Sequence, residues 1–71
     1  MHIGSKIRKE REAAGMSLRD VAAATGGRLT AGGLSLIENG RTPTLPTLTA
    51  LASALHVRFV VTPRGVRMEK S

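Results

Sequence analysis

The sequence contains no cysteine, no tryptophan and no tyrosine, and a single phenylalanine is its only aromatic residue. Without cysteine, the chain can form neither disulfides nor zinc–thiolate sites. Its two histidines, His2 and His56, have no co-ligands at metal-binding spacing, so we expect no metal ion and no other cofactor. The near absence of aromatic rings also argues against binding of single-stranded nucleic acid, which relies on stacking of bases on such rings.

Long apolar segments are missing as well. The uninterrupted apolar runs are only a few residues long, whereas a helix needs roughly 20 apolar residues to cross a bilayer. The N-terminal region has no apolar signal segment, so we expect a cytoplasmic protein without a membrane partner. A chain of 71 residues has a modest core. Because disulfides and metal ions are excluded, pairing with a second copy is the expected additional source of stability.

Acidic residues are few, with 5 against 11 lysines and arginines, and the formal net charge is +6. A compact basic domain favours polyanionic partners, nucleic acid first, although the same charge would also serve solubility alone. No phosphate-binding loop, metal cluster or nucleophile–base set is visible in the sequence, so we expect no enzymatic activity.

Apolar periodicity and capping residues predict four helices. The first spans about residues 3–14. The second begins after Ser17, which together with Asp20 forms an aspartate variant of the capping box. The third spans residues 31–39, although two glycines in its first turn each cost up to about 1 kcal/mol of helix propensity. The fourth spans about residues 44–55 and carries a stripe of leucines.

Strand-like patterns follow these helices. Residues 57–62 are mostly β-branched or aromatic, Pro63 and Gly65 mark a turn, and residues 66–69 alternate between apolar and charged. The sequence therefore predicts a β-hairpin or β-arm over residues 58–71.

The predicted second to fourth helices carry a familiar series of motifs. A capped short helix and a glycine turn precede a second short helix that ends in Ile37-Glu38-Asn39-Gly40-Arg41, and a Thr-x-Pro-Thr-Leu linker then leads into the leucine-striped helix. This order resembles the phage repressor and Cro-type helix-turn-helix family, also called the xenobiotic-response-element family, over about residues 3–57. The matching residues are Ile7, Arg11, Gly15, Ser17, Leu18, Val21, Ala22, Gly26, Leu34, Ser35, Ile37, Glu38, Asn39, Gly40, Arg41, Pro43, Leu45, Leu48, Leu51, Ala52 and Leu55.

The resemblance implies a mainly α fold. A four-helix, repressor-like helix-turn-helix domain over residues 1–57 would be followed by a C-terminal β-hairpin or β-arm over residues 58–71. The implied function is sequence-specific binding of double-stranded DNA by a transcriptional regulator, most simply a repressor from a bacterium or a phage.

The chain also departs from the family pattern. The turn between the second and third helices looks two residues longer than usual, and Leu18 replaces a glutamine that commonly grips a phosphate. At the start of the third helix, Ala31-Gly32-Gly33 stands where long polar side chains are usual. The β-structured end resembles that of some antitoxin-type members, in which the terminal strand pairs with its copy in a dimer.

By this resemblance, the helix of residues 31–39 lies in the major groove. Ser35 is expected to hydrogen-bond a base, and Thr30 or Ala31 to touch a thymine methyl group. Arg28, on the longer turn, is expected to contact either a guanine or a phosphate, and both interpretations stay open. Direct base contacts look few, so DNA shape should contribute to recognition.

Phosphate contacts are expected at the N-terminus of the second helix, where free N–H groups and the helix dipole favour an anion. Arg19, Asn39 and Arg41 would assist, with a plain helix C-cap as the alternative role of Asn39. The expected DNA-binding residues are Ser17, Arg19, Arg28, Thr30, Ala31, Gly32, Ser35, Asn39 and Arg41. The resemblance also implies a structural salt bridge between Arg11 and Glu38, which joins the first and third helices.

The β-arm is the expected dimerisation element, because a lone two-stranded hairpin is marginal in water and its open edges invite pairing. We expect Val57, Phe59 and Val61 to pack on the fourth helix and Val60 to stay exposed unless two arms share a sheet. A symmetric dimer would present two recognition helices to half-sites about 34 Å apart in a palindromic operator. The expected interface residues of this homodimer are Phe59, Val60, Val61, Val66 and Met68.

Two other functions remain open. The first is an antitoxin-type protein that neutralises a toxin or other partner protein and autoregulates its operon. The β-arm favours it, although the flexible toxin-binding segment usual in antitoxins is reduced here to Lys70-Ser71. The second is an architectural or RNA-binding protein, which the charge fits and the helix-turn-helix motifs do not.

Overall fold

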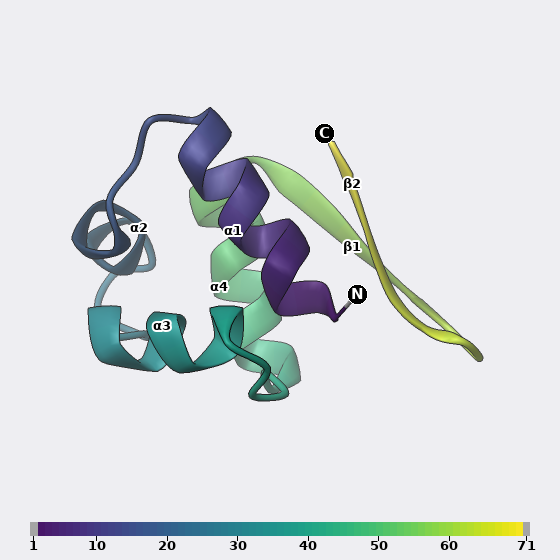
Figure 1. Cartoon of the computed structure of the whole chain (residues 1–71). Coiled ribbons are helices and arrows are strands. Elements are labelled where there is room, and N and C mark those ends of the chain that lie inside the picture. The colour runs from purple at the N-terminus through teal and green to yellow at the C-terminus, as the bar shows by residue number, and fades with distance from the viewer. Residues whose placement is uncertain (1, 71) are drawn as a thin grey trace.

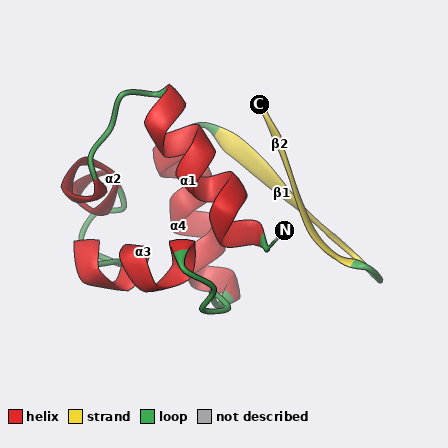
Figure 2. Cartoon of the chain, in the orientation of Figure 1, coloured by secondary structure: helices red, strands yellow, loops and turns green. Residues whose placement is uncertain are grey.

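The computed structural model describes residues 2–70 as four helices followed by a two-stranded antiparallel β-hairpin (Figure 1). Figure 2 shows that the helices form one body and that both strands lie on one side of it. The elements are α1 Ile3–Ala13, α2 Leu18–Ala24, α3 Ala31–Glu38, α4 Leu45–Leu55, β1 Val57–Thr62 and β2 Gly65–Lys70. The predicted fold class is confirmed. Met1 and Ser71, the end residues of the two predicted parts, lie outside the described residues.

Hydroxyl side chains begin three of the four helices. Ser17 Oγ accepts a hydrogen bond of 3.0 Å from the Asp20 N–H, and the Ser17 N–H donates to Asp20 Oδ2 at 2.8 Å. Thr30 and Thr44 cap α3 and α4 by accepting from the N–H three residues later. The predicted capping box is thus confirmed, and each cap satisfies a backbone donor that has no partner within its own helix.

One core joins all four helices. Each helix contributes one fully buried large side chain: Ile7 from α1, Val21 from α2, Leu34 from α3 and Leu51 from α4. Burial of such a side chain contributes about 1.5–3 kcal/mol to stability. Val57 of β1 is part of the same buried cluster. The core therefore helps to set the position of α3, since Leu34 and Ile37 belong to this buried cluster, although α3 itself is glycine-rich.

A glycine in α1 allows that helix to approach α3 closely. Gly4 is buried, and a Cβ atom at this position would overlap the carbonyl oxygen of Ile37 and lie 2.9 Å from the Cα of Glu38. Any side chain at position 4 would therefore push α1 away from the C-terminal end of α3. Sequence patterning did not single out this residue, because nothing local distinguishes it from a glycine of low helix propensity.

The hairpin packs on its own helices at its base. His56, in the left-handed region with φ of 56°, ends α4 and turns the chain into β1. Phe59 pairs with Met68 across the hairpin, and both side chains pack against the helical core. Farther out, the hairpin turn extends away from the helices (Figure 1). The base of the predicted arm is thus continuous with the domain core.

The expected packing of the outer hairpin was wrong in two respects. Val61 does not pack on α4 but is 66% exposed, and Val60 on the opposite face is half-buried. The reason is that β1 and α4 do not close together along their full length. An apolar groove of about 260 Å³ remains between them, lined by Leu48, Ala52 and Phe59 among others, with Val61 at its edge.

Candidate nucleic-acid interface

The turn between α2 and α3 accommodates its extra residues through one threonine and two glycines. Thr25 is buried, and its Oγ1 donates to the Ala22 carbonyl at 2.6 Å and accepts from the Leu29 N–H at 3.2 Å. Gly26 and Gly27 both have positive φ angles, of 71° and 84°, which glycine adopts at little cost. The Thr25 hydroxyl therefore links the end of α2 to Leu29 across the longer turn, and α2 and α3 stand in a helix-turn-helix arrangement.

Helix α3 divides into an inner and an outer face. Leu34, Ile37 and Glu38 are buried against the rest of the domain. On the outer face, Gly32 is exposed, and Ala31 and Ser35 are half-buried. Thr30, the N-cap of α3, is exposed as well. The structure therefore brings together most of the side chains expected to face bases.

The structure adds one residue to this outer face that sequence reasoning missed. Leu36 lies one turn after Gly32 and is 52% exposed. Leucine on a helix is more often a core residue, so its type pointed away from the surface. Its position in the sequence could have identified it. Leu34 and Ile37, three residues apart, mark the buried face of the helix, and Leu36 between them falls outside that face.

At the N-terminus of α2, where phosphate contacts were expected, two backbone N–H groups already form hydrogen bonds within the chain. The capping box occupies the backbone N–H groups of Ser17 and Asp20, and it places a carboxylate at the start of α2. Hydrogen bonds from Ser17, first from its backbone and then from its side chain, lower the pKa of Asp20 below its ordinary value. Arg19, next to them, is exposed. The N-terminus of α2 therefore offers fewer free donors than the sequence alone implied.

Asn39 acts as the C-cap of α3. Its Nδ2 donates to the Ser35 carbonyl at 2.7 Å, and Gly40 follows with φ of 120°. The backbone N–H of Arg41 then donates to the Leu36 carbonyl at 3.0 Å. The alternative predicted for Asn39, a helix C-cap, is what the structure shows. Its side-chain nitrogen is thereby used inside the helix.

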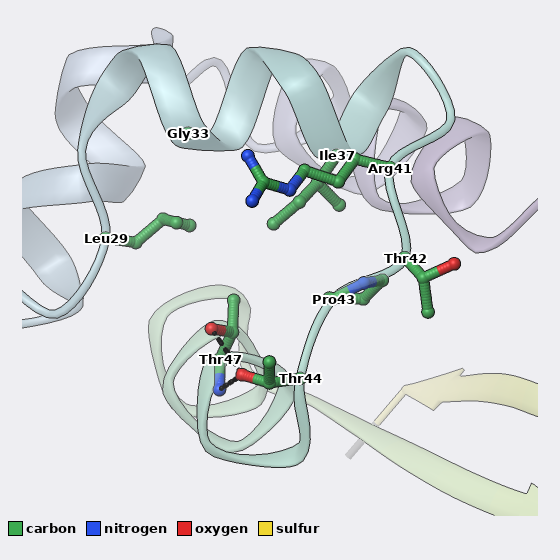
Figure 3. A pocket seen from close by; sticks show the side chains of 8 residues that line it. All are labelled: Leu29, Gly33, Ile37, Arg41, Thr42, Pro43, Thr44 and Thr47. Atoms are coloured by element: carbon green, nitrogen blue, oxygen red, sulfur yellow. Dashed lines mark hydrogen bonds between the residues drawn. The ribbon is translucent and has the colours of Figure 1, made fainter.

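Arg41 extends into a hollow between α3, the following loop and the start of α4 (Figure 3). The hollow has a volume of about 240 Å³, and the guanidinium points back under α3 toward Gly33. Thr44 and Thr47 lie on the opposite wall, with their hydroxyls 3.0 Å apart. No carboxylate lines this hollow. Its chemistry, one cation beside two hydroxyls, suits a phosphate group.

Arg28 lies in a different place from the outer face of α3. It is exposed, and it lines a hollow together with Thr25 of the turn and Thr49 and Ser53 of α4. The structure thus separates Arg28 from Ser35, with which the sequence grouped it.

Arg11 and Glu38 form the expected salt bridge between α1 and α3. Arg11 Nε lies 2.8 Å from Glu38 Oε2, and a second guanidinium nitrogen lies 3.0 Å from Oε1. A third guanidinium nitrogen donates to the Met16 carbonyl at 2.9 Å. The two side chains are only 13% and 5% exposed, and the hydrogen bond to Glu38 raises the pKa of Arg11 above its ordinary value. This bidentate geometry fixes the end of α3 against α1.

The charge distribution around α3 follows from this pairing. Glu38 is the only acidic residue between Asp20 and Glu69, and it is buried on Arg11. The turn, the outer face of α3 and the following loop therefore present Arg28 and Arg41 without a competing exposed carboxylate. Such a surface attracts an anionic polymer.

The described residues were searched for clusters of metal-ligating side chains and for helices that could span a membrane. Within residues 2–70, no three potential metal-ligating side chains cluster together. None of the helices in the same range has the length and apolar character needed to cross a bilayer.

Comparison with known proteins gives one match. A family model described as helix-turn-helix matches residues 7–61, which covers well over half of the chain. The match includes both helices of the motif, the salt bridge and the start of the hairpin. No curated protein and no solved structure matches the chain.

Proposed function

The chain belongs to the helix-turn-helix family of Cro and phage-repressor type, a family of DNA-binding transcription regulators, and from this premise we propose that it is a dimeric repressor whose α3 recognises a palindromic operator. The observation that carries the proposal is the arrangement of α3. Its inner face is fixed by Leu34, Ile37 and the Arg11–Glu38 pair. Apart from Leu36, its outer face carries only short side chains, and it is free of carboxylates.

The outer face suits insertion into the major groove of double-stranded DNA. Ala31, Gly32 and Ser35 have short side chains, so the helix backbone can approach the base edges closely. Ser35 provides a hydroxyl for a base, and Arg19 and Arg41 flank α3 from the neighbouring segments to contact phosphates. Phosphate contacts then set the register of the protein on DNA, while the few base contacts and the shape of the DNA provide sequence preference.

The hairpin supports the dimer in this proposal. Phe59 and Met68 are committed to the core of their own chain, which leaves the outer hairpin for a partner. Val61 and Leu45 are 66% and 67% exposed at the groove between β1 and α4. Within the described residues, each strand has only one neighbour, so each also has an open edge. A second copy could cover both the groove and an edge, with Val60 and Val66 near the contact.

The same groove favours one alternative, a protein-neutralising module of antitoxin type. An apolar groove with exposed leucine and valine at its edge fits an apolar segment of a partner protein. The two functions differ in stoichiometry. Sedimentation of the purified chain as a dimer that binds one operator and forms no complex with the product of an adjacent gene supports the repressor. A stable 1:1 complex with the product of an adjacent gene, formed through the groove, supports the antitoxin.

Selection from a random pool of duplex DNA tests the main proposal. We expect enrichment of a palindrome with half-sites about one helical turn apart. The winning sequence should then bind more tightly than an unrelated duplex at every salt concentration. Binding without enrichment, with an affinity that falls steeply as salt rises, would mean that only phosphates are recognised and would overturn the proposal.

A further inference from the structure

Leu36 is the one large apolar side chain that α3 exposes. It is 52% exposed, while Leu34 and Ile37 on either side of it are buried. The other two large apolar residues with comparable exposure, Leu45 and Val61, both line the groove beside the hairpin. Leu36 lines none of the hollows described above. Nothing within residues 2–70 therefore covers its exposed side.

The surroundings of Leu36 leave it free to approach another molecule. One turn earlier, a Cβ atom added at Gly32 would meet nothing within 4 Å, so the space beside the leucine is open. Its neighbours on the outer face are Ser35 and the capping residue Asn39, whose amide nitrogen is engaged. The nearest charged side chains along the chain are Glu38, which is buried and paired, and Arg41.

We propose that Leu36 is a specificity-determining residue that packs against the C5 methyl group of a thymine, so that each half-site requires a T·A pair at one fixed position. This inference rests on the proposed function, since it assumes that α3 enters the major groove. A thymine methyl is the apolar group that base pairs display there. A G·C pair at this position would instead place the cytosine amino group or guanine O6 against a leucine that offers no hydrogen bond.

Gly32 makes this contact geometrically reasonable. A long side chain at position 32 would hold the helix away from the groove floor, whereas glycine lets the backbone come close. A leucine one turn later can then reach a methyl group. The same feature explains why a helix with so few hydrogen-bond donors can still distinguish base pairs.

Replacement of thymine by deoxyuridine tests the proposal, because it removes only the methyl group. On the selected operator, substitution at one position in each half-site should weaken binding of the wild-type protein by about fourfold per half-site, or roughly fifteenfold when both are changed. The Leu36→Ala variant should bind the thymine and deoxyuridine operators nearly equally. Leu36 is exposed, so this variant should fold, as circular dichroism would verify.

A matched leucine provides the control. Leu45→Ala removes a leucine outside α3 that is also more than half exposed, and it should keep the full wild-type ratio between the two operators even if dimerisation and overall affinity change. If the wild type and Leu36→Ala lose the same affinity at every deoxyuridine position, the inference is wrong although the protein is a sequence-specific binder. If no operator can be selected, the proposed function itself fails.

Discussion

The α3 region and the outer hairpin both expose apolar side chains, yet they are built in different ways. Helix α3 is held by a buried ion pair, buried aliphatic residues and the closely packed Gly4 of α1. The outer hairpin lies on another side of the helices (Figure 1) and is held mainly at its base. A groove is left open beside it. A surface that must match base edges needs fixed geometry, whereas a surface that pairs with a copy can gain part of its order on association.

The largest expected effect comes from breaking the support of α3. Glu38→Ala leaves the buried Arg11 guanidinium without its carboxylate partner, which should lower the free energy of unfolding by about 3–5 kcal/mol. Urea denaturation would measure the loss. The double variant Arg11→Met, Glu38→Met removes both charges and should recover most of the stability. A single variant as stable as the wild type would show that the ion pair does not hold α3.

Substitution of a glycine in α1 and of a glycine in α3 should have opposite and smaller effects on stability. Gly4→Ala forces a Cβ atom against the backbone of α3 and should cost about 1–3 kcal/mol of unfolding free energy. Gly32→Ala is the matched control, because its Cβ meets open space and alanine favours the helix by up to about 1 kcal/mol. Thermal unfolding of the two variants should therefore shift in opposite directions. Equal shifts would contradict the close packing of α1 on α3.

A substitution in the outer hairpin should weaken dimerisation and leave the stability of the folded monomer almost unchanged. Val61→Asp places a charge on a residue that is already 66% exposed, so the monomer should lose no more than about 0.5 kcal/mol. The dimer dissociation constant, measured by sedimentation equilibrium, should rise at least about tenfold because the charge would be buried between copies. Val61→Thr should have a much weaker effect. An unchanged dimer in Val61→Asp would exclude this side of the hairpin as the interface.

The smallest expected effect concerns the start of α2, which supports the α3 region from a distance. The pKa of Asp20 is lowered by its hydrogen bonds from Ser17, so the capping box contributes its full stability above the ordinary pKa of about 3.8. That contribution is lost as pH falls through the lowered pKa of the folded state. Urea midpoints at about pH 5 and below pH 3 should therefore differ less in Asp20→Asn than in the wild type. Identical differences would contradict the capping role.

Features with a local signature could be predicted from the sequence. The helix caps at Ser17, Thr30 and Thr44, the stop at Gly40 and the alternating strands all depend on residues within a few positions of each other. The family resemblance added the pairing of Arg11 with Glu38, which no local pattern contains. These signals were sufficient to predict the order of the helices and strands and the residues on the inner face of α3.

The remaining features depend on distances between elements, which local patterns do not encode. The tight contact of Gly4 with α3 and the open groove that exposes Val61 both arise from how elements cross. Arg28 shows the same limit, because the path of the longer turn places it beside α4 and not beside Ser35. Leu36 was missed for another reason: its chemistry indicates a core residue, and only its angular position on α3 shows otherwise.

If a fixed α3 from each of two paired copies contacts one operator, binding must depend on the spacing of the two half-sites. A footprint of the wild-type protein on the selected palindrome should show two protected half-sites about one helical turn apart. Insertion of five base pairs between them turns the half-sites to opposite sides of the duplex, and high-affinity binding should then be lost. Protection of each half-site by one independent chain, unchanged by the insertion, would contradict this dependence on spacing.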